Sequence, residues 1–344
     1  MIYISLGIFL TILSFLEIFF RRTQNSQFSF AIVMVCLFVL SFLRFEVGTD
    51  WSSYLGMYNG NISTEKIEIG YRTLNNFFSG LGFPYFVFLA VISAISLGFI
   101  HLVVRRFKYK IIILFVYFSE LFLYLNFSGM RQGIAIAVTL YSTLFIINKN
   151  FKVFVGLVLF ASLFHTSALS FLLAYYIYHL EFTKKRLILL LTILIIAIAT
   201  RHNIIEFLLT YIYNDKLFYY LTVHGVSENN TINFIIGIIK RSIILLIYFT
   251  CPKDVRNNYN LPSFIKVYVF GFIVYLLFYQ ISEDIATRVG SYYLIFDLLI
   301  ISILFQLPIH VYKKLLIFVM IIGMYMYKLY GYSQFTTYIY NTII

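Results

Sequence analysis

The 344-residue chain is poor in charged residues, in proline and in cysteine. Charged side chains make up 12% of the sequence and hydrophobic ones 61%, a balance that a soluble domain could not bury. Four prolines and 17 glycines leave little room for disordered linkers. These scarcities exclude a soluble protein with flexible tails and predict one integral membrane domain over residues 1–344.

The two cysteines, Cys36 and Cys251, lie in or beside apolar runs and form no CxxC pair. No second histidine or cysteine stands at metal-ligand spacing, so we expect small core residues, no metal site and no cofactor. The N-terminus is apolar from Ile2 to Phe20 without a basic leading region, which favours a first transmembrane helix over a removed signal peptide. The net charge of +12 is confined to particular loops, so nucleic acid is not an expected partner.

Long apolar runs, separated by polar residues, indicate where the chain crosses the membrane. They fall at about 2–20, 28–43, 84–104, 111–126, 133–148, 152–164, 167–180, 187–200, 233–250, 264–281, 286–307 and 311–329. They far exceed the alternating ten-residue pattern of an outer-membrane barrel, so we predict an all-α polytopic bundle. We expect about twelve spans, and at least ten, some short or bent, because several runs fall below the roughly 20 residues that cross a bilayer untilted.

Lysine and arginine gather in alternate loops. More than half of the 26 lie in short segments at 21–27, 105–110, 149–152, 181–186, 251–266 and 313–314. The positive-inside rule places these segments in the cytoplasm, against anionic membrane lipids, and both termini outside. Because 149–152 and 181–186 then share a side, 152–164 and 167–180 are better interpreted as two short helices than as one bent helix. Residues 44–83 and 201–232 become external loops with room for short amphipathic helices.

The external segment 44–83 holds the only tryptophan and two carboxylates suited to general-base chemistry, Asp50 and Glu68. Asp50 also suits the N-cap of a short helix from Trp51 to Tyr58. Glu68 could equally pair with Arg72, four residues further on. The segment is therefore our first candidate for one wall of a site.

Three arginines, Arg44, Arg131 and Arg288, stand at the predicted outer edges of spans, where a guanidinium is costly without a partner or a purpose. Each could extend to lipid phosphates, but three at a similar depth, with Arg72 nearby, favour a shared anionic ligand. The planar guanidinium donates two parallel hydrogen bonds to phosphate. Arg131 opens a helix at Gly129–Gly133, where glycine admits either a ligand or a neighbouring helix.

Other ionisable residues are candidates on weaker grounds. His165, at the tip between two short spans, is interpreted either as a structural residue or as a proton carrier and hydrogen-bond donor. Glu120 and Asp297 lie within spans, where carboxylates are functional suspects by default. Lys240 and Arg241, in another span, are their expected partners or ligand contacts.

An ordered set of motifs resembles the EpsG-like, Wzy-type polysaccharide polymerases. The stretches are Arg44-Phe-Glu-Val-Gly-Thr-Asp50-Trp-Ser-Ser-Tyr54, Glu68-Ile-Gly-Tyr71, Arg131-Gln132-Gly-Ile-Ala135, Phe164-His165-Thr-Ser167-Ala168-Leu169, and Arg288 with Tyr292. The resemblance covers about residues 40 to 300. Trp51 replaces a common tyrosine and Ile69 a common proline, departures that bear on the shape of the loop.

The resemblance implies a glycosyltransferase-type polymerase of O-antigen (lipopolysaccharide), capsule or exopolysaccharide assembly. Such enzymes join oligosaccharides carried on undecaprenyl pyrophosphate at the periplasmic or external face of the bacterial cytoplasmic (inner) membrane. By the same resemblance and the residue chemistry, we expect substrate and pyrophosphate binding by Arg44, Arg72, Arg131, Gln132, Arg288 and Tyr292, and catalysis by Asp50, Glu68 and His165. A chain-length regulator is a further expected partner. A flippase or transporter of lipid-linked sugars, and less so a membrane O-acyltransferase, stay open as rivals.

Overall fold

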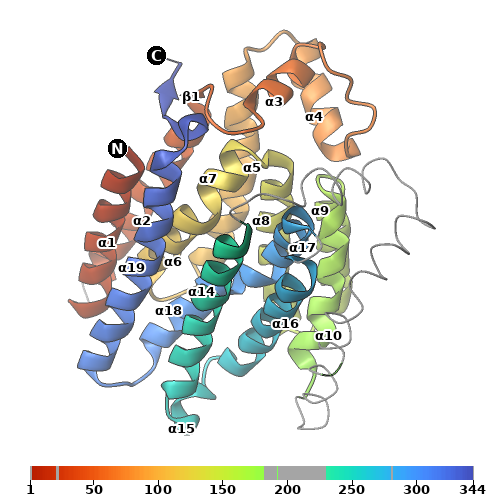
Figure 1. Cartoon of the computed structure of the whole chain (residues 1–344). Coiled ribbons are helices and arrows are strands. Elements are labelled where there is room, and N and C mark those ends of the chain that lie inside the picture. The colour runs from red at the N-terminus through yellow and green to blue at the C-terminus, as the bar shows by residue number, and fades with distance from the viewer. Residues whose placement is uncertain (1, 21–22, 182–191, 193–229, 280–281, 344) are drawn as a thin grey trace.

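The computed structural model describes residues 2–20, 23–181, 192, 230–279 and 282–343. Its elements, in chain order, are α1 (Ile2–Phe19), α2 (Thr23–Phe42), β1 (Arg44–Phe45), α3 (Trp51–Tyr58), α4 (Ile69–Gly80), α5 (Tyr85–Val104), α6 (Lys110–Tyr117), the π-helix η1 (Phe118–Phe122), α7 (Leu123–Phe127), α8 (Met130–Ile147), α9 (Phe151–Ser162), the 3-10 helix η2 (Thr166–Leu172), α10 (Leu173–His179), α14 (Asn230–Thr250), α15 (Lys253–Arg256), α16 (Leu261–Tyr279), α17 (Glu283–Leu294), α18 (Phe296–Gln306), α19 (Val311–Gln334), η3 (Thr336–Tyr338) and β2 (Asn341–Thr342) (Figure 1).

Helices that could cross a membrane account for most of the described chain. Eight are long and apolar enough, and two shorter apolar helices accompany them at Gln27–Phe42 and Phe151–Ser162. Apart from the run at 187–200, every predicted apolar run coincides with helix. That run, except Thr192, and the predicted external loop up to residue 229 lie outside the described residues. The prediction of an all-α polytopic membrane protein is confirmed.

The doubtful pair at 152–164 and 167–180 forms two antiparallel pieces. The ring of Phe151 lies 4.9 Å from that of Tyr175, and the ring of Phe154 lies 6.0 Å from that of Phe171. An earlier residue of α9 thus contacts a residue of α10, and a later residue of α9 contacts one in η2, which precedes α10. This is the contact pattern of two antiparallel segments. The chain reverses at Phe164 and His165, as the charge pattern predicted, and this turn carries site residues.

Three crossings form the centre of the bundle. The segments Lys110–Phe127, Met130–Ile147 and Ile285–Gln306 are apolar and mostly buried, as expected for helices surrounded by other helices. Outer helices instead expose apolar side chains such as Ile8, Ile12 and Leu16 on α1. Lipid is the solvent that such a surface requires.

Helices α3 and α4 cover one end of the bundle, and both ends of the chain lie at that same end (Figure 1). Strand β2 closes on β1, with Arg44 opposite Thr342. Gly48 donates its N–H to Thr337 O at 2.8 Å. Its φ of +104° and the 2.3 Å that would separate a Cβ from Phe127 O require glycine here. The segment 44–83 is therefore anchored to the bundle at its first turn.

Candidate functional site

The start of α4 brings Glu68 to the tip of the α9–η2 hairpin. Glu68 occupies the N-cap of α4, and Gly70 donates its N–H to Leu163 O at 2.7 Å. A Cβ on Gly70 would lie 2.8 Å from that oxygen, so a side chain would force the two elements apart. Thr166, in the hairpin turn, donates its hydroxyl to Glu68 Oε1 at 3.2 Å.

Glu68 forms an ion pair with Arg131, in the first turn of α8. Their side chains are 13% and 19% exposed, so the pair is shielded yet still reached by solvent. Arg131 Nε also donates to the Tyr54 hydroxyl on α3 at 3.4 Å. Burial by itself raises the pKa of Glu68, but the Arg131 guanidinium and nearby His165 lower it below its ordinary value.

His165 is linked to α17 through a hydroxyl relay. Its Nδ1 lies 2.5 Å from Ser167 Oγ, and Ser167 Oγ donates to the Tyr292 hydroxyl on α17 at 3.2 Å. Thr166, the next residue along the chain, contacts Glu68. The hairpin turn that carries His165 therefore joins Glu68 to α17.

Gln132 and Arg288 join the cluster from neighbouring positions. Gln132 donates its amide to Arg288 O at 3.0 Å, which fixes α17 against the start of α8. Arg288 precedes Tyr292 by four residues, and in a helix that spacing places both on one face. The structure therefore gathers Glu68, Arg131, Gln132, His165 and Tyr292, with Arg288 one turn away.

Arg44 is buried against Met130, the residue that precedes Arg131. It is only 1% exposed, and its guanidinium donates to Ser41 O at 2.5 Å and to Met130 Sδ at 3.1 Å. Its Cζ lies 5.5 Å and 5.2 Å from the ring centres of Trp51 and Phe127. Burial lowers the pKa of Arg44 to about 10. These contacts are those of a packing residue held among α2, α3, α7 and α8, next to the residue before Arg131.

Arg72 and Asp50 lie nearer the surface of the segment 44–83. Arg72 donates to Glu65 O at 3.1 Å, on the surface of the segment 44–83, and Arg131 takes the place expected for it beside Glu68. Asp50 occupies the N-cap of α3 as expected, but its side chain makes no capping hydrogen bond. It is exposed and accepts from the Thr49 hydroxyl at 3.2 Å.

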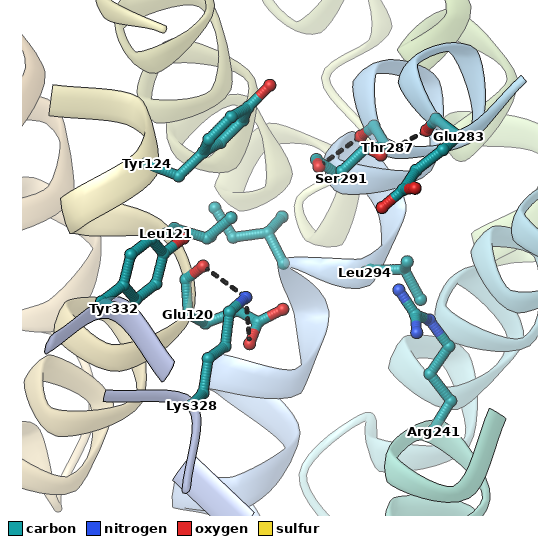
Figure 2. A pocket seen from close by; sticks show the side chains of 11 residues that line it. Glu120, Leu121, Tyr124, Arg241, Glu283, Thr287, Ser291, Leu294, Lys328 and Tyr332 are labelled. Atoms are coloured by element: carbon teal, nitrogen blue, oxygen red, sulfur yellow. Dashed lines mark hydrogen bonds and ion pairs between the residues drawn. The ribbon is translucent and has the colours of Figure 1, made fainter. Parts of the chain in front are cut away.

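A second group of charged side chains, centred on Glu120, lies inside the bundle. The position of Glu120 within a predicted span had indicated such a group. Glu120 pairs with Lys240 of α14, the partner expected from the sequence, and with Lys328 of α19 at 3.0 Å (Figure 2 shows the Glu120–Lys328 pair). Asp297 instead accepts from the Tyr325 hydroxyl at 2.8 Å. Lys328 lies within the apolar run predicted at 311–329, and its ion pair with Glu120 shows that it faces the other helices.

Comparison with known proteins gives one clear match. The EpsG family matches residues 27–343, which is nearly the whole chain and includes every residue of the cluster. No curated protein and no solved structure matches the chain.

Proposed function

The chain belongs to the EpsG family, and we propose that it joins undecaprenyl-pyrophosphate-linked oligosaccharide repeat units at the outer face of the bacterial cytoplasmic membrane. The family consists of Wzy-like polysaccharide polymerases, so a polymerase-type role follows from membership. The proposal adds the lipid-linked donor and the side of the membrane. The observation that carries it is the Arg131–Glu68 pair with His165 beside it.

Arg131 is the group best placed to receive a pyrophosphate. Its guanidinium is shielded but reachable, and it stands in the first turn of α8, where free backbone N–H groups and the helix dipole also favour an anion. Arg288 would bind the same or the second pyrophosphate from α17. Gln132 would hold α17 against α8 through its bond to Arg288 O, and Tyr292 would hold α17 against η2 through its bond to Ser167.

The proposed reaction exchanges one bond for another. A hydroxyl oxygen of the incoming unit attacks the anomeric carbon of the growing chain and forms the new glycosidic bond. The bond from that carbon to the pyrophosphate oxygen breaks, and the electron pair leaves with the lipid pyrophosphate. The hydroxyl proton passes to a protein base. The arginines stabilise the charge that develops on the leaving group.

Glu68 is the base we favour, and substrate binding would activate it. In the ion pair its pKa is lowered, so it accepts a proton poorly. A pyrophosphate on Arg131 would draw the guanidinium away and leave a shielded carboxylate, whose pKa then rises because burial disfavours charge. His165, linked to Ser167, would orient the acceptor or share the proton. Asp50 is exposed to solvent, which makes it the weaker candidate.

Incubation of the purified protein with a synthetic lipid-linked repeat unit tests this function. The proposal predicts a ladder of products that differ by one repeat. Transport of lipid-linked sugars is the second candidate, because the ion pairs of Glu120 with Lys240 and Lys328 place charge inside the bundle. Movement of the substrate across liposomes without new glycosidic bonds would identify a flippase and refute polymerisation.

A further inference from the structure

A cavity of about 280 Å³ lies between two walls of the bundle, beside the second group of charges. One wall carries Glu120 and Leu121 of η1, Tyr124 of α7, and Lys328 and Tyr332 of α19; the other carries Glu283, Thr287, Ser291 and Leu294 of α17, Ile295, and Arg241 of α14. Figure 2 shows the labelled side chains of these walls on opposite sides of the cavity. The π-helical turn η1 contributes Glu120, and such turns are frequent at functional sites.

Helix α17 separates this cavity from the Arg131 cluster. Glu283, Thr287 and Ser291 recur every four residues and line the cavity. Arg288 and Tyr292 stand one position further along and belong to the cluster. One residue turns a helix by about 100°, so two adjacent faces of α17 serve the two places. A substrate held at the cluster therefore has this cavity on the adjacent face of the same helix.

We propose that the cavity binds a sugar ring of the lipid-linked glycan, an inference that rests on the proposed function. The acidic lining residues Glu120 and Glu283 match the basic Arg241 and Lys328 in number, and carboxylates in a lining disfavour a pyrophosphate. Sugar hydroxyls both donate and accept, so a mixed lining suits them. The volume lies near the lower end of the roughly 300–1,000 Å³ usual for ligand pockets, so one ring enters rather than a whole repeat unit.

The hydroxyls of the cavity are arranged to accept from a sugar. Thr287 donates its hydroxyl to Glu283 O and Ser291 donates to Thr287 O, so the lone pairs of both remain for sugar O–H groups. The apolar edges of Leu121, Leu294 and Ile295 can contact the C–H faces of a ring. Polar groups and apolar patches thus alternate around the space, as a pyranose requires.

Arg241 supplies hydrogen-bond donors for a sugar ring in the cavity. Its guanidinium lies 3.6 Å from the centre of the Tyr275 ring and donates to Gly237 O at 2.8 Å. Within the described ranges it forms no ion pair, whereas Lys240 and Lys328 both pair with Glu120. Gly237 makes room for this arrangement, because a Cβ there would lie 2.8 Å from Arg241 Nη1. Arg241 lines the cavity, so those of its N–H groups that face the space can donate to hydroxyl or carboxylate oxygens of the ring.

Cysteine protection tests the proposal in the full-length protein, reconstituted in nanodiscs. In a Cys36→Ser, Cys251→Ser background, Thr287→Cys places a thiol in the cavity and Ser79→Cys places one at the far end of α4. A small water-soluble methanethiosulfonate reagent is applied with no lipid, with bare undecaprenyl pyrophosphate, or with the lipid-linked repeat unit extracted from cells lacking this protein. We expect the repeat unit to slow labelling of Thr287→Cys at least several-fold, the bare carrier to have little effect, and Ser79→Cys to label alike throughout.

Three results would overturn the inference: no labelling of Thr287→Cys without lipid, equal rates with the repeat unit, or equal protection by the bare carrier. Ladder formation by the same cysteine variants is measured in parallel, so a failure of the proposed function is seen separately. As a second readout, Ser291→Ala and Arg241→Gln should raise KM for the repeat unit several-fold and change kcat less. A fall in kcat alone would contradict a sugar-binding role.

Discussion

Glu68 pairs with Arg131, 63 residues away, although Arg72 stands only four residues further along the chain. Arg72 donates instead to Glu65 O at 3.1 Å. The hydrogen bond from Gly70 N to Leu163 O directs the start of α4 toward the hairpin tip, and there Glu68 meets α8. This long-range pair brings α3, α4, α8 and the hairpin turn to one place.

Loss of either site arginine should stop chain growth. We expect Arg131→Ala and Arg288→Ala to fold in the membrane but to yield single repeat units, with rates reduced on the order of 100-fold or more, because charge stabilisation of the leaving pyrophosphate is removed. Chain length on a gel is the measurement. Arg105→Ala, at the opposite end of α5, serves as the matched control, and Arg72→Ala should have a smaller effect than Arg131→Ala. Normal chain length in both site variants would refute the assignment.

The two carboxylates should differ in their importance for rate. Glu68→Gln removes the favoured base and should lower the initial rate of bond formation by roughly 100-fold or more. Asp50→Asn should lower it far less, since Asp50 is exposed to solvent. Initial rates with one lipid-linked substrate decide the matter, and the reverse order of effects would make Asp50 the base.

The Glu68–Arg131 pair should also contribute to stability in a pH-dependent way. A carboxylate whose pKa is lowered on folding stabilises the protein above its unfolded pKa, and the stabilisation is lost as pH falls through the folded pKa. The gap in Tm between the wild type and Glu68→Gln should therefore be constant near neutral pH. It should shrink only below about pH 4.3, the ordinary value for glutamate. A gap that closes between pH 8 and pH 6 would show that the pair is not ionised as described.

Arg44 should behave as a structural residue. Arg44→Gln removes the donors to Ser41 O and Met130 Sδ and leaves a buried polar group, which costs on the order of 1–3 kcal/mol. We expect a lower Tm and a lower yield of folded protein in detergent, measured by thermal size-exclusion chromatography. An unchanged Tm with lost polymerisation would return Arg44 to the binding residues.

The sequence was most informative where a residue type determines position directly. Apolar runs must lie in lipid or in the core, so the spans could be predicted almost to their ends. Charged residues near span ends were also identified, and Glu68, Arg131 and His165 do converge. The convergence itself needed the structure, because nothing local distinguishes Arg131 from Arg44 as a ligand contact.

Other features depended on tertiary contacts. The interior position of Lys328, within the apolar run predicted at 311–329, follows from its ion pair with Glu120 of η1. The polar stripe of Glu283, Thr287 and Ser291 has helical spacing and could have been found from the sequence. That this stripe lines a cavity appears only in the structure, where η1, α7 and α19 form the opposite wall.

The most direct test of the central claim is the stoichiometry of lipid release. Purified protein is given the lipid-linked repeat unit as its only substrate, and glycosidic bonds formed and undecaprenyl pyrophosphate released are counted in the same reaction, with Arg131→Ala as the inactive comparison. The account predicts one lipid pyrophosphate released for each new bond. Bonds that form without release of the carrier, or that require a nucleotide sugar, would contradict it.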